Sequence, residues 1–183
     1  MLPDQSHINR VRDALWVSKG GRATVMLGAG FSRNANKKSV SRKDFPLWHD
    51  ITTKLCELLY PDSSDLKHAL SQAAGTSGFL KLAQEYKVAF GRDALDTLID
   101  ETIPDDDYMP GDLHKRMVRL PWCDIFTTNW DTLIEKSSIF AADRNYSTII
   151  RPEQLISAPP TQNNKTPRIF KIKQRHHIHR RRL

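Results

Sequence analysis

Cysteine and long apolar runs are both scarce in this chain. Its only cysteines, Cys56 and Cys123, lie far apart and form no C-x-x-C pair. This spacing excludes a zinc ribbon and a disulfide framework, so we expect packing cysteines and no zinc. No apolar run reaches the length of a membrane-spanning helix, and the first residues lack the basic and apolar regions of a signal peptide. We therefore expect a globular, cytoplasmic protein without a membrane partner.

Acidic residues are absent from the end of the chain. Eight of the 28 Lys and Arg residues follow residue 164 with no Asp or Glu, which leaves 20 basic and 21 acidic residues before that point. Residues 173–183 are basic and show no apolar periodicity, so we expect a disordered tail there. The positive charges are not interleaved with placed aromatic residues, and we therefore expect no specific nucleic-acid partner.

Glycine is sparse but concentrated at one strand end. A short β-prone run at residues 23–27 leads directly into Gly28-Ala29-Gly30, and Ser32 follows two places later. Glycines permit unusual dihedrals and leave no side chain between backbone N–H groups and an anion. The pattern predicts a turn that binds the phosphates of a nucleotide.

The turn lacks the residues of two common nucleotide sites. A dinucleotide fingerprint G-x-G-x-x-G needs a third glycine where this chain has Arg33, and the acid at a suitable distance, Asp50, belongs to an amphipathic helical pattern. No G-K-[ST] follows, which excludes a P-loop. A hydride-transferring Rossmann enzyme is therefore disfavoured.

Helical periodicity dominates the space between two predicted strands. We expect strands at residues 23–27, 122–131, 147–150 and 168–172, and helices at 5–19, 48–60, 65–73, 79–90, 93–102, 112–120 and 132–137. The polar segment 33–43 is a candidate lid, and 155–165 is read as a loop. The fold class is therefore α/β, a Rossmann-like parallel sheet with a helical insertion at about residues 47–120.

A second polar motif ends the strand predicted at residues 122–131. It reads Thr127-Thr128-Asn129-Trp130-Asp131. Asparagine is unfavourable where a strand ends unless its amide is used, so Asn129 is the strongest candidate for a functional side chain. Asp131 is equally suited to cap the helix that follows.

Together, the glycine turn, the second motif and Pro46-Leu47-Trp48 resemble the sirtuin family, in its bacterial branch of antiphage-defence NADases. The resemblance covers about residues 20–172, in matching order. It implies a sirtuin-like NAD-binding domain over residues 1–172. The four-cysteine module of the deacylase branch is absent, which favours hydrolysis of NAD to nicotinamide and ADP-ribose over protein deacylation.

The resemblance also implies roles for the motif residues. Gly28, Ala29, Gly30 and Ser32 would bind the pyrophosphate, with Thr127 and Thr128 completing the NAD pocket. Catalytic roles fall to two residues: Asn129 would hold the ribose hydroxyls or the attacking water, and Asp131 would contact the nicotinamide end. The alternatives are a plain tight turn, a capping role for Ser32 or Asp131, and core positions for Trp48 and Trp130.

One expected residue is missing from the pattern. Sirtuin-like enzymes place a catalytic histidine in a K-x-H-G setting, whereas Phe170-Lys171-Ile172 is followed here by Lys173-Gln174. His176, His177 and His179 lie in the basic tail, and His49 and His114 are read as surface or packing residues. We interpret the chain as a domain cut short near that histidine, in which the residues after Ile172 replace the native continuation, for instance through a shifted reading frame.

The resemblance thus implies an NAD hydrolase of antiphage defence, although this chain lacks the catalytic histidine at the expected place. A non-catalytic module that binds NAD or ADP-ribose, or an inactive truncated product, is the alternative, and deacylation is a weaker one. The expected partners are NAD and either a second copy of the chain or another component of a defence system.

Overall fold

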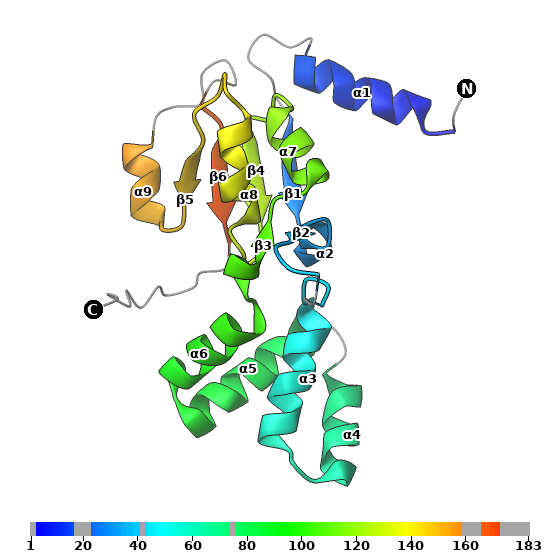
Figure 1. Cartoon of the computed structure of the whole chain (residues 1–183), viewed down its shortest axis with the longest axis vertical. Coiled ribbons are helices and arrows are strands. Elements are labelled where there is room, and N and C mark those ends of the chain that lie inside the picture. The colour runs from blue at the N-terminus through cyan, green and yellow to red at the C-terminus, as the bar shows by residue number, and fades with distance from the viewer. Residues whose placement is uncertain (1–2, 17–22, 41–42, 74–75, 159–165, 173–183) are drawn as a thin grey trace. The chain divides into compact units, whose positions relative to one another are not determined.

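Four parallel strands form the main sheet of the protein. The structure, a computed structural model, describes residues 3–16, 23–40, 43–73, 76–158 and 166–172. The strands are β1 (Thr24–Leu27), β4 (Asp124–Thr127), β5 (Ser147–Ile149) and β6 (Arg168–Lys171). Their spatial order is β1-β4-β6-β5, and every neighbouring pair runs parallel (Figure 1). The predicted α/β class with a parallel sheet is confirmed.

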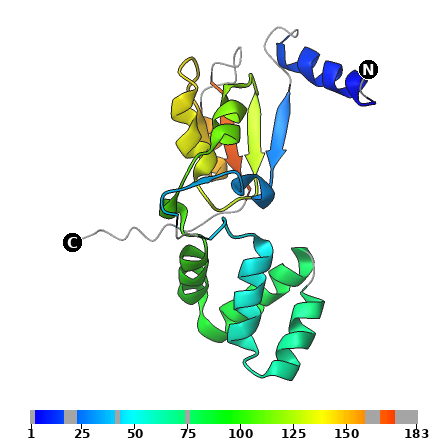
Figure 2. The ribbon, with the colours of Figure 1, turned by 45° about the vertical axis from the view of Figure 1, so that its right-hand side comes forward.

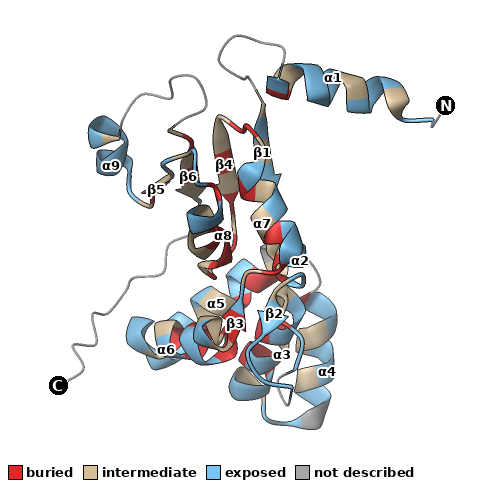
Figure 3. Cartoon of the chain, turned by 45° about the horizontal axis from the view of Figure 1, so that its top comes forward, coloured by how far each residue is buried: buried red, intermediate tan, exposed pale blue. Residues whose placement is uncertain are grey.

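The sheet buries an aliphatic core against helices. Helices α7 (Asp112–Arg119) and α8 (Leu133–Ser137) lie on one face of it, as Figure 2 shows. Ile125 of β4, Ile169 of β6 and Val118 of α7 are fully buried in the core cluster. Figure 3 colours much of α8 and the end of β4 as buried. Phe126 of β4 and Phe170 of β6 are register partners, so their side chains point to the same face of the sheet. Their rings stack with 4.7 Å between centroids.

The register aligns the carboxyl ends of three strands. Leu27 pairs with Thr127, and Thr127 pairs with Lys171. At the opposite end of the strands, Arg168 makes a bidentate ion pair with Asp124, with N–O distances of 2.7 and 3.0 Å. The residues that follow β1, β4 and β6 therefore emerge beside one another, where parallel α/β sheets bind ligands.

A helical unit with its own core spans residues 43–104. It contains α3 (Trp48–Leu59), α4 (Ser63–Gln72), α5 (Thr76–Phe90) and α6 (Arg92–Thr102). Leu55 and Cys56 are fully buried there, and Trp48 packs edge-on against Phe79 at 4.6 Å. Helix α7 belongs to the unit that contains the sheet, so the helical stretch expected over 47–120 is divided between two units.

The remaining helices and strands belong to the sheet unit. They are α1 (Gln5–Trp16), α2 (Ala29–Ser32), β2 (Asn36–Lys37), η1 (Asp105–Asp107), β3 (Tyr108–Met109), η2 (Ser138–Phe140) and α9 (Pro152–Ser157). None of the described helices combines the length and apolar character needed to cross a membrane.

Two loop expectations need correction. The polar segment 33–43, read as a candidate lid, contributes β2, which pairs antiparallel with β3; residues 41 and 42 lie outside the described residues. The loop expected from residue 155 begins inside α9. This helix starts at Pro152, which suits the first helical position, and the Gln154 side chain accepts the N–H groups of Ile150 and Arg151.

Among the described glycines of the sheet unit, packing requires the absence of a side chain at Gly111. It precedes α7, and a Cβ atom there would lie 1.9 Å from the Asn34 carbonyl oxygen. Backbone occupies that space, so the neighbour cannot rotate away. The close approach of residue 34 to α7 thus depends on the missing side chain.

We predict that Gly111→Ala lowers the free energy of unfolding by about 2 kcal/mol or more, because the added methyl overpacks a backbone contact. Urea denaturation followed by circular dichroism measures the change. A stability equal to that of the wild type would contradict the described contact.

Candidate functional site

The two predicted motifs meet at the aligned strand ends. Gly28 follows β1 and Asn129 follows β4, 101 residues later. The Asn129 Nδ2 donates to the Gly28 carbonyl oxygen at 3.1 Å and to Ser32 Oγ at 2.9 Å. The structure therefore joins the glycine turn directly to the second motif.

The glycines of the turn are not required by the fold itself. Gly28 is extended, with φ −111° and ψ 175°, and Gly30 lies in α2 without a positive φ. The expectation that the turn uses unusual dihedrals is therefore wrong. A Cβ atom at either position meets nothing within 4 Å. Both glycines face open space, as a backbone that receives a ligand would.

Asp131 is buried and both of its carboxylate oxygens are engaged. Oδ2 accepts the Ser32 hydroxyl at 2.7 Å, and Oδ1 accepts the Leu133 N–H at 3.1 Å. The second bond satisfies the amide of the first residue of α8, but the N-cap of that helix is Thr132, so the prediction that Asp131 is the N-cap is wrong by one residue. Ser32 is the last residue of α2 and Gly28 is its N-cap, so Ser32 does not cap that helix.

These contacts determine which atoms of the Asn129 amide donate hydrogen bonds and which atom is left to accept one. A carboxylate only accepts hydrogen bonds, so Ser32 gives its single proton to Asp131 and accepts from Asn129. The two N–H groups of the Asn129 amide are then both used. Its Oδ1 is buried and has no partner among the described residues. The site therefore offers one acceptor, which suits a hydroxyl or water that donates a hydrogen bond.

The other predicted residues shape this strand end. Thr127 is buried and its Oγ1 accepts the Asn129 N–H at 3.0 Å, which holds the turn after β4. The Thr128 N–H donates to the Leu27 carbonyl at 3.3 Å, extending the pairing of β1 and β4 by one step. Ala29 begins α2, and Trp130 is half-buried.

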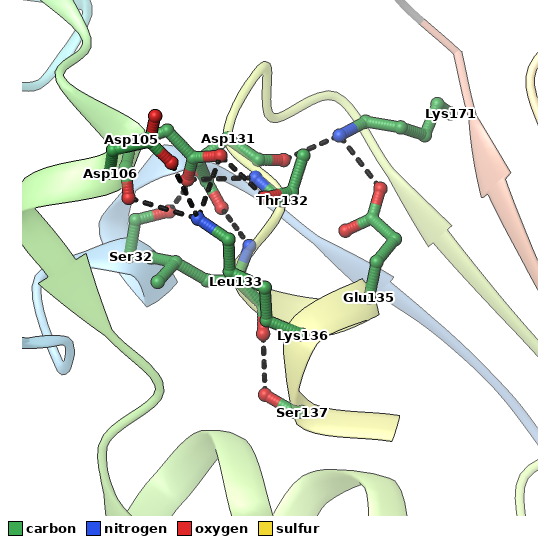
Figure 4. A network of polar contacts seen from close by, with 10 residues as sticks. All are labelled: Ser32, Asp105, Asp106, Asp131, Thr132, Leu133, Glu135, Lys136, Ser137 and Lys171. Atoms are coloured by element: carbon green, nitrogen blue, oxygen red, sulfur yellow. Dashed lines mark hydrogen bonds and ion pairs between the residues drawn. The ribbon is translucent and has the colours of Figure 1, made fainter. Parts of the chain in front are cut away.

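Asp105 is a supporting residue that the sequence did not single out. It accepts the N–H of Thr132 at 3.0 Å, and Lys136 lies 3.2 Å from its carboxylate (Figure 4). Burial acts to raise the pKa of Asp105, but the hydrogen bonds from Thr132 and the Lys136 ammonium outweigh it and hold that pKa below its usual value. The acidic turn thus fixes the start of α8 from outside the motif.

His114 is a second missed residue. It lies in α7, is fully buried, and packs edge-on against Phe31 of the glycine turn at 4.8 Å. Neither ring nitrogen makes a well-formed hydrogen bond within the described residues. Burial lowers the pKa of His114, opposed by the charge of Asp131 and the backbone of Asn34. Its spacing in α7 marked it only as a packing or surface residue, and the structure places it in the packing beneath the turn.

Two hollows bordered by described residues lie away from the predicted site residues. The helical unit has a cavity of about 230 Å³ bordered by Tyr60, His68, Lys81 and Glu85, and the sheet unit has a hollow of about 430 Å³ beside Met109 and Phe140. Neither is lined by a predicted site residue. In the described part of the chain no three His, Cys, Asp or Glu side chains gather in a way that would hold a metal. The site is thus defined by its strand-end chemistry.

We predict that His114→Leu flattens the decline of stability at acidic pH. The folded-state pKa is depressed, so the unfolded chain binds the proton more tightly, and stability is lost as pH falls below about 6.5 towards that lowered pKa. At pH 8 the variant should differ from the wild type by less than about 1.5 kcal/mol. Urea unfolding between pH 8 and pH 5 gives both quantities, and equal pH slopes would refute the assignment.

Comparison with known proteins adds no relative to this picture. No family model matches the chain, and no curated protein is similar to it.

Proposed function

We propose that this chain is a sirtuin-like NAD-binding domain that belongs to an NAD hydrolase of antiphage defence. The proposal starts from the motif resemblance described above. In it, the backbone N–H groups of the glycine turn bind the pyrophosphate, and the end of β4 receives the ribose next to nicotinamide. Water replaces nicotinamide on that ribose, so that hydrolysis of the bond between them releases nicotinamide and ADP-ribose.

The observation that carries the proposal is the buried acceptor of Asn129 that has no hydrogen-bond partner among the described residues. Its amide nitrogen is held by Gly28 and Ser32, and only Oδ1 is left for a ligand. A ribose hydroxyl is a donor of the right chemistry. A buried acceptor without a partner costs about 1–3 kcal/mol, which a bound hydroxyl would recover.

The glycine turn supports the same ligand. Gly28 and Gly30 have ordinary dihedrals and open surroundings, so nothing in the fold requires a glycine there, and a ligand bound against the backbone would account for both. An anion beside these residues would meet peptide N–H groups without steric hindrance. Asn129 is hydrogen-bonded directly to the Gly28 carbonyl of this turn. A ligand whose phosphate lies next to a ribose could therefore contact both.

A non-catalytic module that binds NAD or ADP-ribose is the second candidate. It is favoured by Lys173-Gln174, which stand where the resemblance expects His-Gly; both residues lie outside the described part of the structure. His114 does not replace the missing histidine, because its ring is fully buried against Phe31. Binding without turnover distinguishes the module from the hydrolase.

We predict that Gly30→Ala weakens binding of ADP-ribose about tenfold, equivalent to about 1.4 kcal/mol, while the fold keeps or gains stability. The methyl meets no protein atom but occupies the space proposed for the pyrophosphate. Isothermal titration calorimetry and urea unfolding measure the two effects. Gly111→Ala is the matched control, since the same added methyl there costs stability. Unchanged affinity in Gly30→Ala would count against the phosphate site.

Asn129→Ala tests the ribose end of the site. We expect ADP-ribose affinity to fall about tenfold or more, and any release of nicotinamide from NAD to fall about 100-fold. Calorimetry and chromatography of nicotinamide give the two readouts. The exposed residue Asn145 supplies the control variant Asn145→Ala, which should behave as the wild type. If the wild type neither binds nor consumes NAD, both candidate functions are wrong.

A further inference from the structure

Lys171 carries a buried positive charge at the carboxyl end of β6. Its side chain is 8 % exposed, and its ammonium lies 2.8 Å from Glu135 Oε1 on α8. The same ammonium donates a hydrogen bond to the backbone carbonyl of Asp131 (Figure 4). An ammonium at this depth needs both a counter-charge and hydrogen-bond acceptors, and these two partners supply them.

Asp131, which Lys171 contacts, is connected to Asn129 by a series of hydrogen bonds whose donors and acceptors are fixed. The Asp131 carboxylate accepts from Ser32, Ser32 accepts from Asn129, and Asn129 donates to the Gly28 carbonyl. Each bond allows one direction of donation, because the carboxylate has no proton to give. The orientation of the Asn129 amide therefore depends on where the backbone of Asp131 is held.

We propose that Lys171 is a positioning residue of the site: its bond to the Asp131 carbonyl holds the Asp131–Ser32–Asn129 chain so that Asn129 presents only an acceptor. The ligand group that this acceptor selects is a hydroxyl that donates a hydrogen bond. The inference rests on the proposed function for the identity of that ligand as a ribose, but not for the geometry of the chain.

The ion pair with Glu135 does not by itself explain why a lysine is buried at position 171. Glu135 neutralises the lysine, and a neutral apolar pair of similar volume at 135 and 171 would serve stability about as well. What the apolar pair cannot replace is the donor to the Asp131 carbonyl. Removing both charges together therefore separates the positioning role from the cost of leaving one buried charge unpaired.

The test compares two double variants that each remove one partly buried ion pair joined to β6. Lys171→Met with Glu135→Met removes the pair near the site. Arg168→Met with Asp124→Leu removes the bidentate pair at the opposite end of β4 and β6, and is the matched control. The readouts are the hydrogen-exchange rate of the Asn129 side-chain amide, by ¹⁵N NMR of the full chain, and the affinity for ADP-ribose by calorimetry. Both are measured well below the unfolding temperature of each variant.

In the first variant we expect the Asn129 amide protons to exchange at least about tenfold faster and the affinity to fall about tenfold. The exchange rate and the affinity should both stay at the wild-type level in the control. The single variant Lys171→Arg keeps a donor, so its Asn129 amide should exchange more slowly than in the first double variant. Unchanged exchange in the first variant, or equal acceleration in the control, would overturn the inference. The exchange readout needs no nucleotide, so a wild type that fails to bind ADP-ribose would refute the proposed function and leave the exchange result to decide the role of Lys171.

Discussion

A buried carboxylate imposes the central constraint on this protein. Asp131 lies at the end of β4 with both oxygens out of water, and such a group is tolerated only when it is fully hydrogen-bonded. Ser32 from the glycine turn and the Leu133 amide from α8 meet that requirement. Because these partners come from segments about 100 residues apart, satisfying one carboxylate joins the turn after β1 to the helix after β4. The polarity of Asn129 follows from this arrangement.

Recognition of a nucleotide and its cleavage place different demands on the proposed site. The glycine turn, Ser32, Asn129 and Asp131 lie together. Within the described residues they leave one buried acceptor without a partner, close to glycines that no protein atom crowds. These features are suited to a ribose and a phosphate. A proton acceptor for cleavage is a different requirement, and the buried His114 does not meet it. The proposed function therefore has its strongest support at the step of nucleotide recognition.

The sequence predicted the parallel sheet and most helices because their apolar spacing matches the side that packing buries. It also singled out Asn129, since an asparagine at a strand end has few structural explanations. Asp131 was equally suited to cap the next helix, and its role in the site came only from the resemblance. It did not identify Asp105, Glu135 or Lys171, because a charged residue in an acidic turn, on a short helix or at a strand end has the same local pattern whether solvated or paired. Their roles depend on contacts between distant segments. Gly111 was missed for the same reason, since only the approach of Asn34 shows why a side chain is excluded there.

A crystal structure of the full chain with ADP-ribose tests the central claim most directly. The account predicts that a ribose hydroxyl lies about 2.7 Å from Asn129 Oδ1 and that the pyrophosphate contacts the backbone of Gly28 to Gly30. ADP-ribose bound elsewhere, such as in the cavity of the helical unit, would contradict the account. So would a ribose at the turn with Asn129 Oδ1 still unpaired.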